Sequence, residues 1–349
     1  MRLERMSIVQ VKQTSSARNS TVMLRSKRFT LLPLCVVISL LGTMRPAFSI
    51  AEQNTMVNLP ADIRNAIVRI GVPLPNGVKE YGTGIVIRKK PDQNGTGGWL
   101  CVLTADHVVA SKDSGWYIAF GDGDVPIGRL EDYEATIRIR HPVDALGRRV
   151  DLAILGVYVQ DLTSIPNIPN NITIGAPPNE NLVACGYGWA GTRPQNANYY
   201  VVTEEFGTFR NGTNTWENLN GTPLQWASSL QTYNFISLQF DLDFDQGGPN
   251  TGEAFVLTGD SGGPSLQFVN NAWVLTGIHS ASQRLFDANN SGEEDTGDHA
   301  RAGFLSVDVR LANYINWINA SCAAVPEPFS LTALSAGLLG LLLKRRGAA

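Results

Sequence analysis

The hexapeptide Gly259-Asp260-Ser261-Gly262-Gly263-Pro264 is the most informative stretch of this chain. A serine hydroxyl is a weak nucleophile near neutral pH, so hydrolysis through serine needs a base and an oxyanion site. Glycines on both sides of Ser261 allow a tight turn and bring backbone N–H groups close to a bound carbonyl. A Gly-rich surface turn has the same composition, so the interpretation depends on the rest of the chain.

Two further segments carry the side chains that such a serine would need. Residues 103–109, Leu-Thr-Ala-Asp-His-Val-Val, follow an apolar run and place His107 at the end of a predicted strand. Residues 150–155, Val-Asp-Leu-Ala-Ile-Leu, place Asp151 at the head of a predicted buried strand. A carboxylate buried there would need a hydrogen-bonding partner. The order along the chain is therefore His107, Asp151, Ser261.

This order and the local sequences resemble the chymotrypsin/trypsin-like serine peptidases, which carry TAxH, DIAL and GDSGGP signatures. Five more segments match that family in the same order, so the resemblance extends from about residue 67 to residue 318. They are residues 82–87, 141–142, 185–189, 275–278 and 314–318. The resemblance implies an all-β, chymotrypsin-like fold, with two Greek-key β-barrels, the active site between them and a C-terminal helix. Short apolar runs broken by Gly, Asn and Asp are typical of such an all-β protein.

The resemblance also implies a role for each candidate residue. Ser261 would attack the scissile carbonyl, His107 would take the proton and return it to the leaving amine, and Asp151 would hold the imidazole tautomer. The backbone N–H groups of Gly259 and Ser261 would form the oxyanion hole. This chemistry requires no metal and no organic cofactor. We therefore expect a serine endopeptidase that acts on protein or peptide substrates through an acyl-enzyme intermediate.

The resemblance places the specificity pocket around Phe255 and the strand after the nucleophile. Phe255 lies six residues before Ser261, and an apolar group there argues against selection of Lys or Arg. Ser280, Ala281 and Ser282 would form the pocket wall and contact the substrate. We therefore expect an apolar or small residue at the cleavage position.

Several segments depart from the family pattern or add to it. Nothing like the Ile-Val-Gly-Gly terminus of animal members precedes Gly82, so Asp260 needs another partner, and Arg193 is the candidate. The acidic residues 241–245 offer a second source of a pocket carboxylate, although their alternation is more typical of a strand with exposed aspartates. Residues 287–298 have the spacing of a calcium loop, but a solvated Asn/Asp/Gly loop is the preferred interpretation.

Both ends of the chain carry patterns typical of sorting signals. Residues 1–51 are interpreted as a leader and signal peptide, because basic residues precede the apolar stretch 29–42. Residues 325–349 resemble the PEP-CTERM sorting signal, which implies an exosortase partner in a Gram-negative bacterium. A plain tail anchor is the alternative, since the apolar run is at the short limit for a bilayer. Residues 52–324 would then be the trypsin-like protease domain, exported to the envelope or beyond, and membrane-anchored transiently or permanently.

Charge and cysteine content add two expectations. The 28 basic and 31 acidic residues are nearly balanced and give no case for nucleic-acid binding. Cys35 lies in the leader, so three cysteines remain, enough for one disulfide and one free thiol. We expect Cys101 to be a buried thiol, and the sequence permits a Cys185–Cys322 bridge.

Two other functions stay open at this point. A non-enzymatic envelope or matrix-binding protein could use the same scaffold, because a fold does not guarantee a function. The presence of His107, Asp151 and Ser261 together argues against that alternative. An esterase would use the same three residues, and a comparison of ester and peptide substrates would separate it from a peptidase.

Overall fold

The computed structural model describes the central part of the chain, from residue 57 to residue 326 with gaps. The described residues are 57–73, 79–93, 95–111, 113–123, 133–143, 149–176, 181–192, 199–204, 206–216, 223–225, 232–239, 256–283, 299–301 and 305–326. They all belong to one compact unit that begins at Thr43. The predicted leader, the predicted tail beyond residue 326, Phe255, Arg193 and residues 241–245 and 287–298 lie outside this set.

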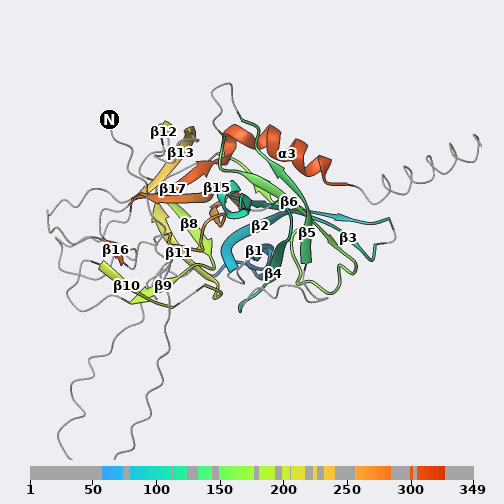
Figure 1. The fold of residues 1–349 in the computed structure, drawn as a ribbon, viewed down its shortest axis with the longest axis horizontal. Coiled ribbons are helices and arrows are strands. Elements are labelled where there is room, and N and C mark those ends of the chain that lie inside the picture. Colours follow the sequence, from blue (N-terminus) through green and yellow to red (C-terminus); the bar gives the residue numbers. More distant parts are fainter. Residues whose placement is uncertain are drawn as a thin grey trace, which may run out of the picture. The chain divides into compact units, whose positions relative to one another are not determined.

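Six antiparallel strands from the first half of the chain form a closed barrel, with neighbours in the order β1-β2-β3-β6-β5-β4 (Figure 1). β3 and β6 are adjacent in the barrel, and they are the two predicted strands beside His107 and Asp151. Every residue of β3 is buried, as its apolar sequence predicts. The strands are β1 (Ile67–Pro73), β2 (Lys79–Pro91), β3 (Gly98–Thr104), β4 (Trp116–Phe120), β5 (Tyr133–Arg140) and β6 (Ala153–Val159).

The second half of the chain contributes an eight-stranded sheet, in which seven strands follow the order β11-β8-β14-β15-β17-β13-β12 and the eighth, β7, pairs with β15. A tight turn joins β14 to β15 at Asn270 and Asn271, which have the positive φ values that such hairpins require. The strands are β7 (Thr173–Ile174), β8 (Asn181–Gly186), β11 (Arg210–Thr215), β12 (Pro223–Gln225), β13 (Thr232–Gln239), β14 (Pro264–Val269), β15 (Ala272–Gln283) and β17 (Leu305–Arg310).

Three short strands, β9 (Ala190–Thr192), β10 (Tyr199–Glu204) and β16 (His299–Arg301), form a separate sheet. The mostly-β class, a closed barrel and the C-terminal helix are thus confirmed. Among the described residues one barrel closes, whereas the large sheet runs from β11 to β12 as an open sheet. One hydrophobic core joins the barrel interior to residues of β14, β15 and β17.

Four short helical elements complete the described part of the fold. They are α1 (Ala61–Ala66), α2 (Asp106–Val109), the 3₁₀ helix η1 (Leu311–Tyr314) and α3 (Ile315–Ala324). α2 follows β3 directly and carries His107. α3 follows β17 of the large sheet and packs against β6 of the barrel (Figure 1). Within the described residues, the helices are too short or too polar to span a bilayer.

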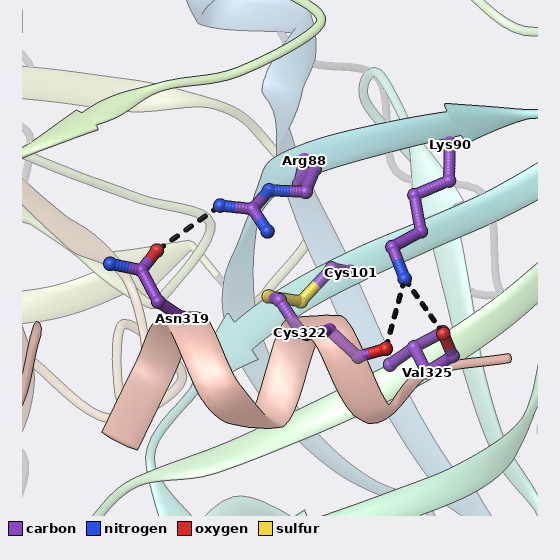
Figure 2. The surroundings of a disulfide bond; sticks show 7 residues. Arg88, Lys90, Cys101, Asn319, Cys322 and Val325 are labelled. Carbon is purple, nitrogen blue, oxygen red and sulfur yellow. Dashed lines mark hydrogen bonds between the residues drawn. A yellow bond between two sulfur atoms is a disulfide. The ribbon is translucent and has the colours of Figure 1, made fainter. Parts of the chain in front are cut away.

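A disulfide joins α3 to the barrel. Cys322 in α3 bonds to Cys101 in β3, with 5.7 Å between the two Cα atoms (Figure 2). Cys185 is buried and has a free thiol. The expectation of a free Cys101 was therefore wrong, and Cys322 pairs with Cys101 in place of the Cys185–Cys322 bridge that the sequence permitted. The physical reason is that pairing depends on where α3 crosses the barrel, and 221 residues separate the bonded cysteines.

Polar contacts reinforce this attachment on both sides of the disulfide (Figure 2). The ammonium group of Lys90 donates to the carbonyls of Ala323 and Val325, at 3.2 Å and 2.8 Å. These carbonyls lie at the end of the helix, where a cation satisfies unpaired acceptors and interacts favourably with the helix dipole. The guanidinium of Arg88 donates to the side-chain oxygen of Asn319 at 3.1 Å. The helix is thus held to β2 and β3 along its length.

Candidate active site

His107 and Asp151 meet where β3 and β6 lie side by side. The ring Nδ1 of His107 lies 2.7 Å from Oδ2 of Asp151, and the backbone N–H of His107 donates to Oδ1 at 2.8 Å. Asp151 is 1% exposed, whereas the His107 side chain is 42% exposed. The carboxylate therefore accepts a hydrogen bond from the Nδ1–H group of His107, which makes Nε2 the acceptor nitrogen of the neutral ring.

Ser280 in β15 makes the third contact with this carboxylate. Its hydroxyl donates to Oδ2 of Asp151 at 2.6 Å, and the residue is buried. The sequence interpretation assigned this side chain to the pocket wall, but the structure directs it toward Asp151. Only the contact between the sheet and the barrel reveals this role, because 129 residues separate the two. Ala281 and Ser282 continue β15, and their side chains lie outside the described set.

The surroundings of Asp151 favour its charged form. Burial by itself would raise the pKa of this carboxyl group. The charge of His107 and the hydrogen bonds from His107 and Ser280 act in the opposite direction, and they hold the pKa of Asp151 below its ordinary value. A negative charge is thus maintained behind the imidazole, where it would stabilise an imidazolium ion.

The loop that carries Ser261 is docked on β2 of the barrel. The backbone N–H of Thr83 donates to the carbonyl of Ser261 at 2.8 Å, and the Thr83 hydroxyl donates to the carbonyl of Gly259 at 2.9 Å. A Cβ atom placed on Gly82 would collide with Val108, the neighbour of His107, and would lie 3.2 Å from the Ser261 carbonyl oxygen. The structure therefore brings the Ser261 loop to the same part of the barrel as His107.

The backbone of this loop has the conformation expected of its glycines. Gly259 and Gly262 have φ values of 92° and 83°, which side chains rarely tolerate. A Cβ on Gly262 would also overlap the Thr83 carbonyl oxygen. The N–H groups of Gly259 and Ser261, predicted as the oxyanion hole, have no acceptor within the part of the chain that is described.

The Asp260 side chain is fully buried in the protein. Its two oxygens accept the N–H groups of Gly188 and Leu257, at 2.7 Å and 2.9 Å. The buried guanidinium of Arg210 donates to the Gly188 carbonyl at 2.7 Å and supplies a nearby positive charge. The predicted partner Arg193 lies outside the described residues. Arg210 was missed because its place next to Asp260 depends on the pairing of β11 with β8.

A second His–Asp pair, in which both side chains are buried, lies behind the Ser261 loop. The ring Nδ1 of His279 is 2.8 Å from Oδ1 of Asp308, whose Oδ2 accepts the Ser265 hydroxyl at 2.6 Å. The backbone of His279 bonds to both Gly262 and Gly263. Burial would lower the pKa of His279, but the charge and hydrogen bond of Asp308 raise it above the ordinary value.

Asp260 predicts a pH dependence of stability. Burial raises its pKa from 3.8 to about 6, against the opposing hydrogen bonds from Leu257 and Gly188 and the charges of His279 and Arg210. The folded protein therefore binds this proton more tightly than the unfolded chain does. The resulting stabilisation is complete below pH 3.8 and is lost as the pH rises to about 6.

Urea unfolding of the wild type and of Asp260→Asn, between pH 3.5 and 7.5, measures this effect. The unfolding free energy of the wild type relative to the variant should fall between about pH 4 and pH 6, by an amount on the order of 3 kcal/mol. Asp151 contributes equally to both proteins and cancels. A difference that stays flat, or rises with pH, would contradict the prediction.

Comparison of the chain with protein-family models and with curated proteins finds no match. Among the described residues, moreover, no group of three His, Cys, Asp or Glu side chains is arranged to hold a metal ion.

Proposed function

We propose that this protein is an exported serine endopeptidase of the chymotrypsin-like fold. The observation that carries the proposal is the pair of hydrogen bonds between Asp151 and His107. Its carboxylate holds both the ring and the backbone of His107, and the Ser261 loop is docked on the same barrel. A His–Asp pair with a purely structural role would not require an exposed imidazole ring beside a glycine-rich turn that carries a serine. In this proposal the large sheet corresponds to the second barrel of the chymotrypsin-like fold.

Each group has a defined task in the proposed reaction. Nε2 of His107 accepts the proton of the Ser261 hydroxyl as its oxygen bonds to the scissile carbonyl carbon. The N–H groups of Gly259 and Ser261 donate to the oxygen that becomes negative. The imidazolium then protonates the leaving amine, and water releases the acyl group by the same route. Asp151 stabilises the imidazolium, while Ser280 keeps the carboxylate in place.

The position of Asp260 supports activity without cleavage of a propeptide. Two backbone N–H groups and the charge of Arg210 hold its carboxylate inside the folded chain. We propose that these internal contacts replace the pairing with a new amino terminus.

We also propose that residues 325–349 are a PEP-CTERM-type signal recognised by an exosortase, so the enzyme acts in the envelope or outside the cell.

A fluorophosphonate probe tests the proposal on the purified full-length protein. We expect one probe molecule per protein, attached at Ser261 in peptide mass spectra, together with digestion of casein. Ser261→Ala should lose both. Labelling without casein digestion, but with turnover of ester substrates, would favour the esterase alternative. Absence of labelling in a folded protein would contradict the proposal and favour the binding scaffold.

A further inference from the structure

Asp106 is a buried charge that the proposed reaction does not use. It immediately precedes His107 on α2 and is 1% exposed. Its two oxygens accept Nε and Nη2 of Arg140, each at 2.5 Å. Such a bidentate pair is both strong and geometrically specific. A small apolar side chain would fill this position without the desolvation cost of an ion pair, so the pair calls for a functional explanation.

A second arginine of β5 reaches the other end of the same helix. Arg138 lies two residues before Arg140, on the same face of the strand. Its Nη1 donates to the carbonyl of Val109 at 2.6 Å, and its guanidinium lies 4.7 Å from the centre of the Trp116 ring. β5 therefore holds α2 at both ends, and His107 lies between the two contacts.

The charges around His107 come from several elements. Asp151 faces the ring from the segment before β6, and Asp106 is on α2 itself. Arg140 on β5 interacts with both carboxylates, and its pKa is raised chiefly by the hydrogen bond to Asp106. Arg149 lies 3.8 Å from Asp106. His141 follows Arg140, and burial lowers its pKa, so it is neutral near pH 7.

We propose that Asp106 and Arg140 are a positioning pair, which orients the helix that carries His107 so that its ring stays aligned between Asp151 and Ser261. The proposal rests on the proposed function. A four-residue helix has too few internal hydrogen bonds to be rigid by itself. The pair therefore supplies from the barrel wall the rigidity that a general base needs, since small displacements of such a group slow a reaction strongly.

The decisive variant is the double substitution Asp106→Asn with Arg140→Gln. It removes both charges together, so neither residue leaves the other as an unpaired buried ion, and the Arg149 side chain that loses Asp106 as a neighbour is 25% exposed, so the variant should fold. Titration with the fluorophosphonate probe gives the number of competent sites, and the time course gives the rate constant for each site. We expect a full titre with a rate constant lowered by about 10- to 100-fold. Asp113→Asn, which breaks the exposed pair with Arg138, is the matched control and should leave the rate unchanged.

The single variants should change the pH profile in opposite directions. Asp106→Asn leaves the Arg140 cation, which should move the acid limb of kcat/KM to lower pH. Arg140→Gln leaves the Asp106 carboxylate, which should move that limb to higher pH. Arg140→Lys keeps the charge, and should keep the limb where it is while losing the bidentate contact. Each shift should be on the order of a few tenths of a pH unit.

Proton NMR tests the same proposal without reference to activity. The proton between Nδ1 of His107 and Asp151 should resonate at low field in the wild type, and its signal should shift or broaden in the double variant. The proposal is overturned if the folded double variant keeps both this signal and the rate constant per site. It is also overturned if only the titre falls, because that result means a purely structural role. If the wild type shows the NMR signal but never labels, the proposed function fails, and a signal that still shifts or broadens in the double variant shows that the pair orients His107 independently of that function.

Discussion

Asp151→Asn should lower the rate constant for Ser261 acylation by about 10⁴-fold, with little change in substrate binding. The reason lies in the three bonds to this carboxylate. Its Oδ1 accepts the backbone N–H of His107, so an asparagine must place its carbonyl oxygen there. The amide NH₂ then faces Nδ1 of His107 and donates to it. The proton moves to Nε2, which can no longer accept the proton of Ser261.

The measurement is the rate of fluorophosphonate labelling and of peptide turnover, each divided by the titre of competent sites. Asp161→Asn is the matched control, because Asp161 is exposed just after β6 and, among the described residues, its carboxylate accepts hydrogen bonds only from Thr163. It should behave as the wild type does. Ser280→Ala removes one hydrogen bond to the carboxylate and should have a much smaller effect. If Asp151→Asn retained activity within about tenfold, Asp151 would not be the orienting group.

Loss of the Cys101–Cys322 disulfide should give the largest fall in stability. The bond closes a loop of about 220 residues and ties the end of the domain to β3. Removing such a cross-link releases chain entropy in the unfolded state, and the usual cost is about 2–5 kcal/mol. The double variant Cys101→Ala with Cys322→Ala should therefore unfold at a lower urea concentration. The contacts of Lys90 and Arg88 with α3 remain and should keep the native fold.

Cys185→Ala is the control for this experiment. It removes a buried sulfur but no cross-link, so its effect should be that of one small core truncation. Peptide mapping of the non-reduced wild type should recover residues 101 and 322 in one linked fragment. Recovery of Cys185 in the linked fragment would contradict the pairing. Equal stability of the double variant and the wild type would show that α3 is held by its other contacts alone.

The amino-acid sequence by itself determined the features that depend on residues close together in the chain. The apolar runs predicted the strands that end near His107 and begin after Asp151, and both are present as β3 and β6. Gly259 and Gly262 adopt the positive φ values that a tight turn around Ser261 requires. These features follow from side-chain periodicity and from the conformational freedom of glycine, and both can be read from the order of residues along the chain.

The connections between distant segments were decided by the tertiary structure alone. Ser280 contacts Asp151 because β15 of the large sheet lies against the barrel. Cys101 bonds to Cys322 because α3 packs on the barrel. Arg210 lies near Asp260 because β11 pairs with β8 in one register. Asp106 of α2 pairs with Arg140 of β5, which lies 34 residues away in the sequence. Strand register and element packing set such partners, and a shift of one residue would turn each side chain to the opposite face.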